Sequence, residues 1–203
     1  MRRRTALELA TTGLLGIAGA GCLGVGGNPT NGDGTEETLY TVSVAVTEES
    51  PAEKLPLELD FAVGRETITE DDPFEIEFEL RNEGDEPIEV SSGAPWPFGV
   101  LWMERKDAPD EPGVTLWTDA YEGSSHVGTE GRRVTWVQDI GLVEDVAGGE
   151  SVADTYELHG DTPGLAPETY RFSIGVGVRA RDASESVSAD FELAVTDGSE
   201  PTD

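Results

Sequence analysis

Few side chains in this sequence could serve in catalysis. Nucleophilic catalysis needs a serine or cysteine beside a base that a third group holds in place, and His126 and His159 are the only histidines. His126 directly follows Ser124 and Ser125, and carboxylates are abundant enough to supply a third partner by chance. The Gly-x-Ser-x-Gly motif of many hydrolases does not occur. The pattern favours a non-enzymatic protein, with an envelope hydrolase centred on His126 as the weaker alternative.

Carboxylate clusters raise the question of a metal site. Two distant histidines and one cysteine do not provide the ligands that a zinc site needs. Residues 70–72 and 107–111 gather oxygen ligands of the kind that calcium accepts, but neither follows the Asp-x-Asp-x-Asp-Gly loop. A strongly acidic surface also produces such clusters by composition alone. The sequence therefore predicts no metal and no other cofactor, with calcium as the open alternative.

The single cysteine, Cys22, ends a short apolar run near the N-terminus. Residues 1–21 have the order of a secretory signal, a basic cap before an apolar segment. The segment is shorter than the roughly 20 residues of a permanent membrane helix. Arg3 and Arg4 resemble the twin-arginine export signal, and residues 19–22 resemble the lipobox of prokaryotic lipoproteins. This resemblance implies that Cys22 carries a lipid; otherwise it is a small residue within a signal removed further along.

Three further parts follow the signal. Residues 22–38 are rich in Gly, Asn, Asp and Thr and have no apolar periodicity, which is typical of a flexible tether. Residues 39–197 are predicted to form one folded domain, and residues 198–203 a disordered acidic tail. The protein is accordingly expected outside the cytoplasm, anchored to the cell membrane by the lipid on Cys22.

Acidic residues dominate the composition, with 42 Asp and Glu against 13 Lys and Arg and a net charge of −29. In dilute buffer this charge opposes compaction, whereas a Debye length of about 3 Å at 1 M salt removes the repulsion. The scarcity of lysine beside arginine resembles haloarchaeal proteins. Four Trp and six Phe argue against the alternative, an acidic disordered chain. The same charge excludes nucleic acid as a partner and leaves membrane contact to the lipid.

Period-two alternation of apolar residues predicts β-strands with one buried face. The alternating sets are Phe74, Ile76, Phe78 and Leu80; Leu57, Leu59, Phe61 and Val63; Tyr170, Phe172, Ile174, Val176 and Val178; and Val187, Ala189, Phe191, Leu193 and Val195. Shorter strands are predicted at residues 39–46, 88–91, 98–104, 114–117, 134–137 and 152–158. Residues 82–87 carry turn chemistry, with Gly84 able to adopt a positive φ.

No stretch has a helical stripe of helical length. Many short strands separated by Gly, Pro and Asp turns predict an all-β fold, an immunoglobulin-like sandwich of two antiparallel sheets. Residues 78–90, 98–102, 114–117 and 147–152 resemble, in their order, the elements of BsuPI-like domains, which are immunoglobulin-like sandwiches named after a bacterial proteinase inhibitor. The resemblance spans about residues 74–158. It implies an extracytoplasmic protease-inhibitor-like domain as an alternative function.

Tyr170 stands in a segment, residues 164–172, that is similar to the loop-into-strand segment of immunoglobulin-type and fibronectin-type domains. In those domains a tyrosine hydroxyl bonds back to nearby backbone and forms a tyrosine corner. Tyr170 is therefore predicted to form such a corner or to be an ordinary core tyrosine. Both interpretations favour a sandwich.

Residues 91–99 place a proline on each side of Trp96 in a predicted intersheet loop. One interpretation is an exposed loop where Trp96, Phe98, Trp117 and Tyr121 anchor a partner. The other, which the general burial of tryptophan favours, is that Trp96 closes one end of the sandwich. The sequence as a whole predicts a lipid-anchored binding or structural module of a halophile's cell envelope, with an envelope protein or a glycan as its partner.

Overall fold

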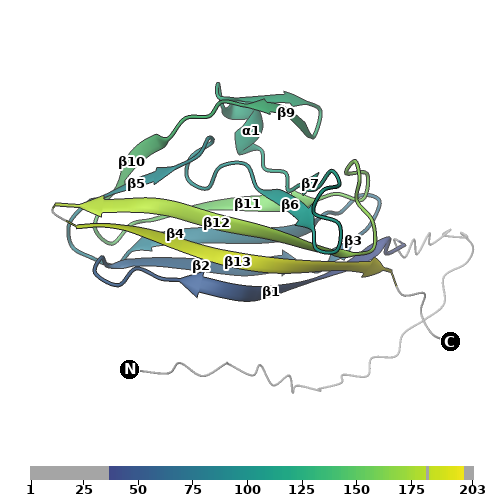
Figure 1. Ribbon diagram of the computed structural model, residues 1–203, viewed down its shortest axis with the longest axis horizontal. Coiled ribbons are helices and arrows are strands. Elements are labelled where there is room, and N and C mark those ends of the chain that lie inside the picture. The colour runs from purple at the N-terminus through teal and green to yellow at the C-terminus, as the bar shows by residue number, and fades with distance from the viewer. Residues whose placement is uncertain (1–36, 182, 199–203) are drawn as a thin grey trace, which may run out of the picture. The chain divides into compact units, whose positions relative to one another are not determined.

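Antiparallel strands make up nearly all of the regular structure (Figure 1). The computed structural model describes residues 37–181 and 183–198; Arg3, Arg4 and Cys22 lie outside the described residues, as does nearly all of the predicted tail. The elements are β1 (Tyr40–Ser50), β2 (Leu57–Arg65), β3 (Thr67–Ile68), β4 (Phe74–Asn82), β5 (Ile88–Ser92), β6 (Trp102–Arg105), β7 (Val114–Thr115), α1 (Ala120–Gly123), β8 (Val127–Glu130), β9 (Arg133–Val137), β10 (Leu142–Val146), β11 (Ser151–Leu158), β12 (Thr169–Ala180) and β13 (Ala183–Asp197). Within the described ranges, no helix is long and apolar enough to cross a membrane.

Two sheets form the sandwich. The larger, eight-stranded sheet has the order β10-β5-β12-β13-β1-β3, with β6 paired to β12 and β7 paired to β6. The smaller sheet has the order β11-β4-β2, and β8 and β9 form a separate two-stranded hairpin. The strand pairs are antiparallel throughout. The predicted all-β, immunoglobulin-like sandwich is confirmed.

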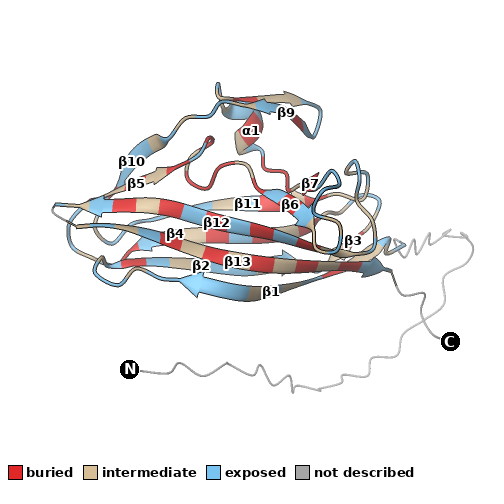
Figure 2. Cartoon of the chain, in the orientation of Figure 1, coloured by how far each residue is buried: buried red, intermediate tan, exposed pale blue. Residues whose placement is uncertain are grey.

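Alternating burial along the strands follows the alternation in the sequence (Figure 2). The four apolar residues of β4 are fully buried, and the predicted inward sets of β12 and β13 are buried as well. Strand β2 departs from the prediction, because Phe61 on its predicted inward face is 39% exposed. Since β2 is the edge strand of the smaller sheet, one of its sides has no neighbouring strand to cover it.

Aromatic rings join the two sheets at the centre of the core. Phe78 of β4 contacts Phe172 of β12 and Phe191 of β13, with ring centroids 6.3 and 5.4 Å apart. Phe172 and Phe191 are stacked at 5.0 Å. Phe78 also meets Phe98 and Tyr156 edge to face, at 6.0 and 5.9 Å. These separations lie within the range at which aromatic pairs attract one another.

The predicted strand at residues 98–104 is shorter than expected, because the chain leaves the sheet before β6. Strands β5 and β6 pair with the same strand, β12, at different positions along it, and residues 93–101 connect them as a loop. The Tyr156 hydroxyl donates to the carbonyl of Gly99 at 2.8 Å and thereby holds this loop against the core. The unpredicted strands β3, β8 and β10 are only two to five residues long and lack a run of alternating apolar residues, so their pairing partners define them.

The turn after β4 depends on Asn82, not on a positive φ at Gly84. Asn82 is fully buried, and its amide donates to the carbonyls of Glu86 and Val146 at 2.8 and 3.0 Å. Gly84 is not among the glycines with positive φ. A Cβ atom there would lie 2.7 Å from Pro56 Cγ, so a close approach, not a special dihedral, requires glycine.

Replacement of Phe78 by alanine tests the role of the central rings. We expect Phe78→Ala to lower the free energy of unfolding by about 3–5 kcal/mol, because it removes a ring that contacts both sheets and leaves a cavity. Phe61→Ala is the matched control, since its ring is partly exposed and contacts Phe191 alone among the described rings. Urea unfolding of both variants measures the difference. Equal losses for the two variants would contradict the central role of Phe78.

Candidate functional site

The predicted exposed aromatic loop is not present. Phe98 and Trp117 are each 5% exposed and Tyr121 is fully buried, so these three side chains belong to the core. The Tyr121 hydroxyl accepts a hydrogen bond from the Leu101 amide at 3.3 Å and donates one to the Leu116 carbonyl at 3.0 Å. Three of the four predicted partner-binding aromatics therefore support the loop from inside, and this prediction was wrong for them.

Trp96 is partly buried and packs against the core. Its indole nitrogen donates to the carbonyl of Val90 at 3.4 Å. This placement agrees with the interpretation that Trp96 closes part of the sandwich.

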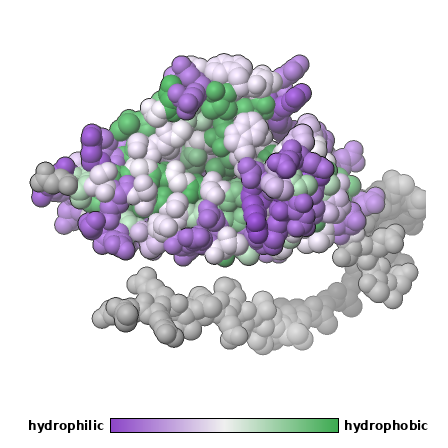
Figure 3. All heavy atoms as spheres, viewed as in Figure 1, coloured by the Kyte–Doolittle hydropathy of each residue, from purple (hydrophilic) through white to green (hydrophobic). Residues whose placement is uncertain are grey.

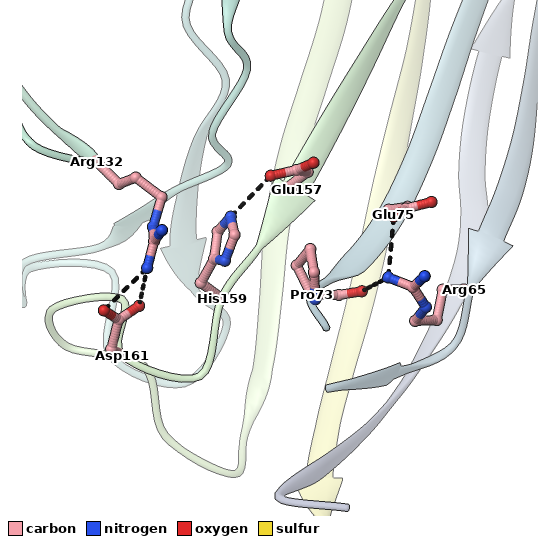
Figure 4. A network of polar contacts seen from close by, with 7 residues as sticks. All are labelled: Arg65, Pro73, Glu75, Arg132, Glu157, His159 and Asp161. Atoms are coloured by element: carbon pink, nitrogen blue, oxygen red, sulfur yellow. Dashed lines mark hydrogen bonds and ion pairs between the residues drawn. The ribbon is translucent and has the colours of Figure 1, made fainter. Parts of the chain in front are cut away.

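The histidines make contacts with acceptor side chains. His126 Nδ1 lies 2.7 Å from Gln138 Oε1, and Ser124 Oγ accepts from the main-chain amide of His126. His159 Nε2 lies 2.7 Å from Glu157 Oε2 (Figure 4). In the described part of the chain, no histidine ring contacts a serine hydroxyl, and no group of three or more His, Cys, Asp or Glu side chains is placed to hold a metal ion.

Tyr170 has the hydrogen bonds of a tyrosine corner. Its hydroxyl accepts from the Ala166 amide at 2.9 Å and lies 3.0 Å from Glu168 Oε1. Burial raises the pKa of Tyr170, so the hydroxyl stays protonated and can donate. The corner fixes the loop between β11 and β12, residues 159–168, against the start of β12.

This loop forms one wall of a groove with a basic lining, here called the basic groove. The other walls are the β6–β7 hairpin and the tip of the β8–β9 hairpin. Its volume is about 460 Å³. The residues that line it are Trp102, Arg105, Pro112, Gly113, Thr115, Arg132, Arg133, Val134, Thr162, Pro163 and Gly164. None of these lining residues is acidic, although the chain carries a net charge of −29.

Arg105 is held at the base of the wall by the corner loop. Its Nη1 lies 2.8 Å from Glu168 Oε1, and its Nη2 donates to the Gly164 carbonyl at 2.8 Å. Gly164 has a φ of +85°, a conformation that glycine adopts without the steric strain of a side chain. The backbone turn thus aims this carbonyl at the guanidinium, and the position of Arg105 depends on the loop.

Arg132 and Arg133 differ in their partners. Arg132 Nη2 lies 3.0 Å from both carboxylate oxygens of Asp161, and these hydrogen bonds lower the pKa of Asp161 (Figure 4). The exposed side chain of Arg133 makes no hydrogen bond or ion pair with any other described residue. Arg133 is therefore the arginine of the groove that forms no ion pair among the described residues, and Glu130 lies directly opposite it in the β8–β9 pairing.

Trp102 projects from β6 beside the groove and is 53% exposed. Trp102 also lines a second depression of about 590 Å³, the sheet hollow. Its other lining residues are Thr47, Val100, Glu104, Arg171, Phe172, Ser173, Asp190, Phe191 and Glu192. Hydrophobic residues gather in the middle of the face drawn in Figure 3, and hydrophilic residues predominate toward its ends. Trp102 is thus an exposed aromatic side chain shared by two adjoining depressions.

Sequence reasoning missed this site, although one signal was available. Trp102 alternates with the buried Leu101 and Met103, so its position predicts an outward-facing ring on a strand of the domain. The arginines gave no such signal, because Arg105 lies in a different segment from the adjacent Arg132 and Arg133. They meet only where two hairpins and a loop converge.

The fold and site define a class: an immunoglobulin-like β-sandwich with a basic, aromatic-flanked groove. The chain belongs to the family described as a domain of unknown function, DUF8130, whose model matches residues 1–173. No curated protein and no solved structure matched the chain.

Removal of the Tyr170 hydroxyl tests how the groove wall is held. We expect Tyr170→Phe to lower the free energy of unfolding by about 1–2 kcal/mol and to speed hydrogen exchange of the Ala166 amide, because that amide loses its acceptor. Tyr40→Phe is the control, since the Tyr40 hydroxyl has no hydrogen bond among the described residues. Unchanged exchange at Ala166 would show that the corner does not hold the loop.

Asp154 of β11, on the smaller sheet, is a partly buried carboxyl group with a shifted pKa. Burial raises the pKa of Asp154, and the Thr118 hydroxyl, which donates to Oδ1 at 2.7 Å, partly opposes this rise. Oδ2 is buried and has no hydrogen-bond partner in the described structure. The folded state therefore binds a proton on Asp154 more tightly than the unfolded chain does.

The pH dependence of stability tests this environment. The folded-state pKa of Asp154 lies above the ordinary value of 3.8. Ionisation of Asp154 therefore lowers the free energy of unfolding as pH rises from 3.8 through the folded-state pKa. We expect Asp154→Asn to gain stability relative to the unsubstituted protein as pH rises from below 3.8. Asp161→Asn should do the opposite, because hydrogen bonds from Arg132 lower the pKa of Asp161. Urea unfolding across the acid range measures the free energy of unfolding of both variants. If the two free energies changed with pH in parallel, the opposite pKa shifts of Asp154 and Asp161 would be contradicted.

Proposed function

We propose that this protein is an exported lipoprotein of a halophile, anchored in the membrane through Cys22, whose sandwich acts as a non-enzymatic binding module of the cell envelope. The N-terminal order of basic cap, apolar run, small residues and cysteine supports the anchor. The basic groove is the contact surface, and its partner is anionic.

The charge distribution carries the proposal. In a chain with 42 acidic and 13 basic residues, a groove lined by three arginines and no carboxylate departs strongly from the average surface. Asp161 balances Arg132, and Glu168 and Glu111 balance Arg105, whereas Arg133 has no such partner among the described residues. Arg133 is thus the unpaired cation among the described groove residues, and it can attract an anion at this place on a surface that otherwise repels anions.

The anchor is tested by mass and location. We expect the mature native chain to begin at Cys22, to carry lipid mass and to sediment with membranes, and the Cys22→Ser chain to appear unlipidated in the medium. Intact-mass analysis and membrane fractionation in high salt measure both. An unlipidated native chain that begins elsewhere would contradict the anchor and leave the groove's role untouched.

Binding is tested with the Cys22→Ser chain and washed cell envelopes in a sedimentation assay. We expect Arg133→Glu to weaken binding about tenfold or more, because it replaces a charge-assisted contact by a repulsive one. Arg81→Glu makes the same charge change at an exposed arginine of β4 outside the groove and should have little effect. Equal effects of the two variants would show that net charge, not the groove, governs the contact.

A further inference from the structure

We infer that the basic groove and the sheet hollow together bind a chain of an acidic polysaccharide, with Trp102 stacked on a sugar ring and Arg133 paired to the anionic group of a neighbouring sugar. This inference rests on the proposed function and names the ligand class of the same site.

The first argument is the length of the binding surface. The sheet hollow and the basic groove share Trp102. The basic groove in turn shares Arg132, Arg133, Thr162 and Pro163 with a third depression of about 640 Å³, which Glu122, Glu130, Gly131 and Asp161 complete. The sheet hollow and the basic groove, joined at Trp102, suit an extended ligand of more than one unit. The third depression carries three carboxylates, which repel an anionic chain, so the acidic ligand ends at Arg133.

The second argument is the chemistry of the sheet hollow. Its polar residues are already set in place by their neighbours: Ser173 Oγ donates to Asp190 Oδ1 at 2.5 Å, and Arg171 bonds to Glu192 through Nε and Nη2 at 3.0 and 2.9 Å. The carboxylates of Glu104, Asp190 and Glu192 can accept hydrogen bonds from neutral sugar hydroxyls but repel anionic groups. The hollow therefore suits a neutral sugar ring that stacks on the Trp102 indole. A few placed polar groups around an apolar surface are the usual make-up of ligand sites.

The third argument concerns the alternative ligand, an acidic peptide. Extended peptides commonly bind by adding a strand to a free sheet edge. The groove wall does not offer one at β6, because β6 pairs with β12 through Glu104 and Arg105 and with β7 through Trp102 and Met103. At β6, recognition therefore comes from side chains, whereas β7 and β9 each pair on one side only. Binding of the oligoglutamate peptide below tests whether those edges are used.

Arg133 gives the site its preference for acidic over neutral sugars. A guanidinium pairs with a carboxylate or sulfate through two parallel hydrogen bonds, and the resulting contact is short. Salt at about 1 M reduces the Debye length to about 3 Å, which weakens an ion pair between exposed groups but leaves ring stacking unchanged. We therefore expect the Trp102 contribution to be the same at low and high salt and the Arg133 contribution to shrink.

Isothermal titration calorimetry of the Cys22→Ser chain tests the inference with four probes: an oligogalacturonate, its methyl ester, a sulfated heparin-derived oligosaccharide and an oligoglutamate peptide. We expect at least one acidic oligosaccharide to bind about tenfold or more tightly than the neutral ester and the peptide. We expect Trp102→Ala and Arg133→Gln each to weaken that binding about tenfold. The carboxylated and sulfated probes distinguish the two sources of negative charge.

Matched controls separate local from general effects. Trp136→Ala removes another tryptophan that is also 53% exposed but lies outside these depressions, and Arg81→Gln removes an exposed arginine of β4. Both should bind the oligosaccharide as the unsubstituted protein does.

Three results would overturn the inference: no binding of either acidic oligosaccharide, equal binding of the methyl ester, or tighter binding of the oligoglutamate. If envelopes still bind through Arg133 in these cases, the proposed binding function stands and only the ligand class is wrong. If envelope binding is also independent of Arg133, both are wrong.

Discussion

The packing of Phe78 against Phe172 and Phe191 is the interaction on which the rest of the structure depends. It connects the smaller sheet to two strands of the larger one through rings that lie 5.4 to 6.3 Å apart. Because side chains alternate between the faces of a strand, a slip of β4 by one residue would turn Phe78 and its three apolar neighbours toward solvent. The register of β4 against β2 and β11 is therefore fixed by the core, and the loops that connect these strands follow from it.

Strand β12, which supplies the core ring of Phe172, also positions the groove. Tyr170 lies two residues before Phe172 in β12, so both side chains point inward, but Tyr170 lies near the strand's end and its hydroxyl reaches the loop between β11 and β12. Glu168 and the Gly164 carbonyl in that loop then bind Arg105. A rigid strand thus sets the position of a loop, and the loop sets the position of an arginine.

The cationic side chains of the protein differ in whether they form ion pairs with carboxylates. Most of its cations are paired with carboxylates: Lys106 and Arg171 both contact Glu192, and Arg179 contacts Glu89. Such pairs on an acidic surface relieve local repulsion more than they add stability, since exposed ion pairs contribute little. Arg133 differs because the tip of the β8–β9 hairpin carries it beside the groove, where no described carboxylate bonds to it.

The sequence by itself determined the all-β fold and the inward faces of β4, β12 and β13, because alternation is a local property that one strand displays alone. It did not determine which aromatic side chains are exposed. Phe98, Trp117 and Trp102 occur in loops or short strands, and Tyr121 occurs in the four-residue helix α1. Contacts such as that between Tyr156 and the Gly99 carbonyl, 57 residues apart, decide which of these side chains are covered. Only the tertiary structure decided the site, because β6, the β8–β9 hairpin and the loop after β11 each contribute part of the groove and none of them predicts the others.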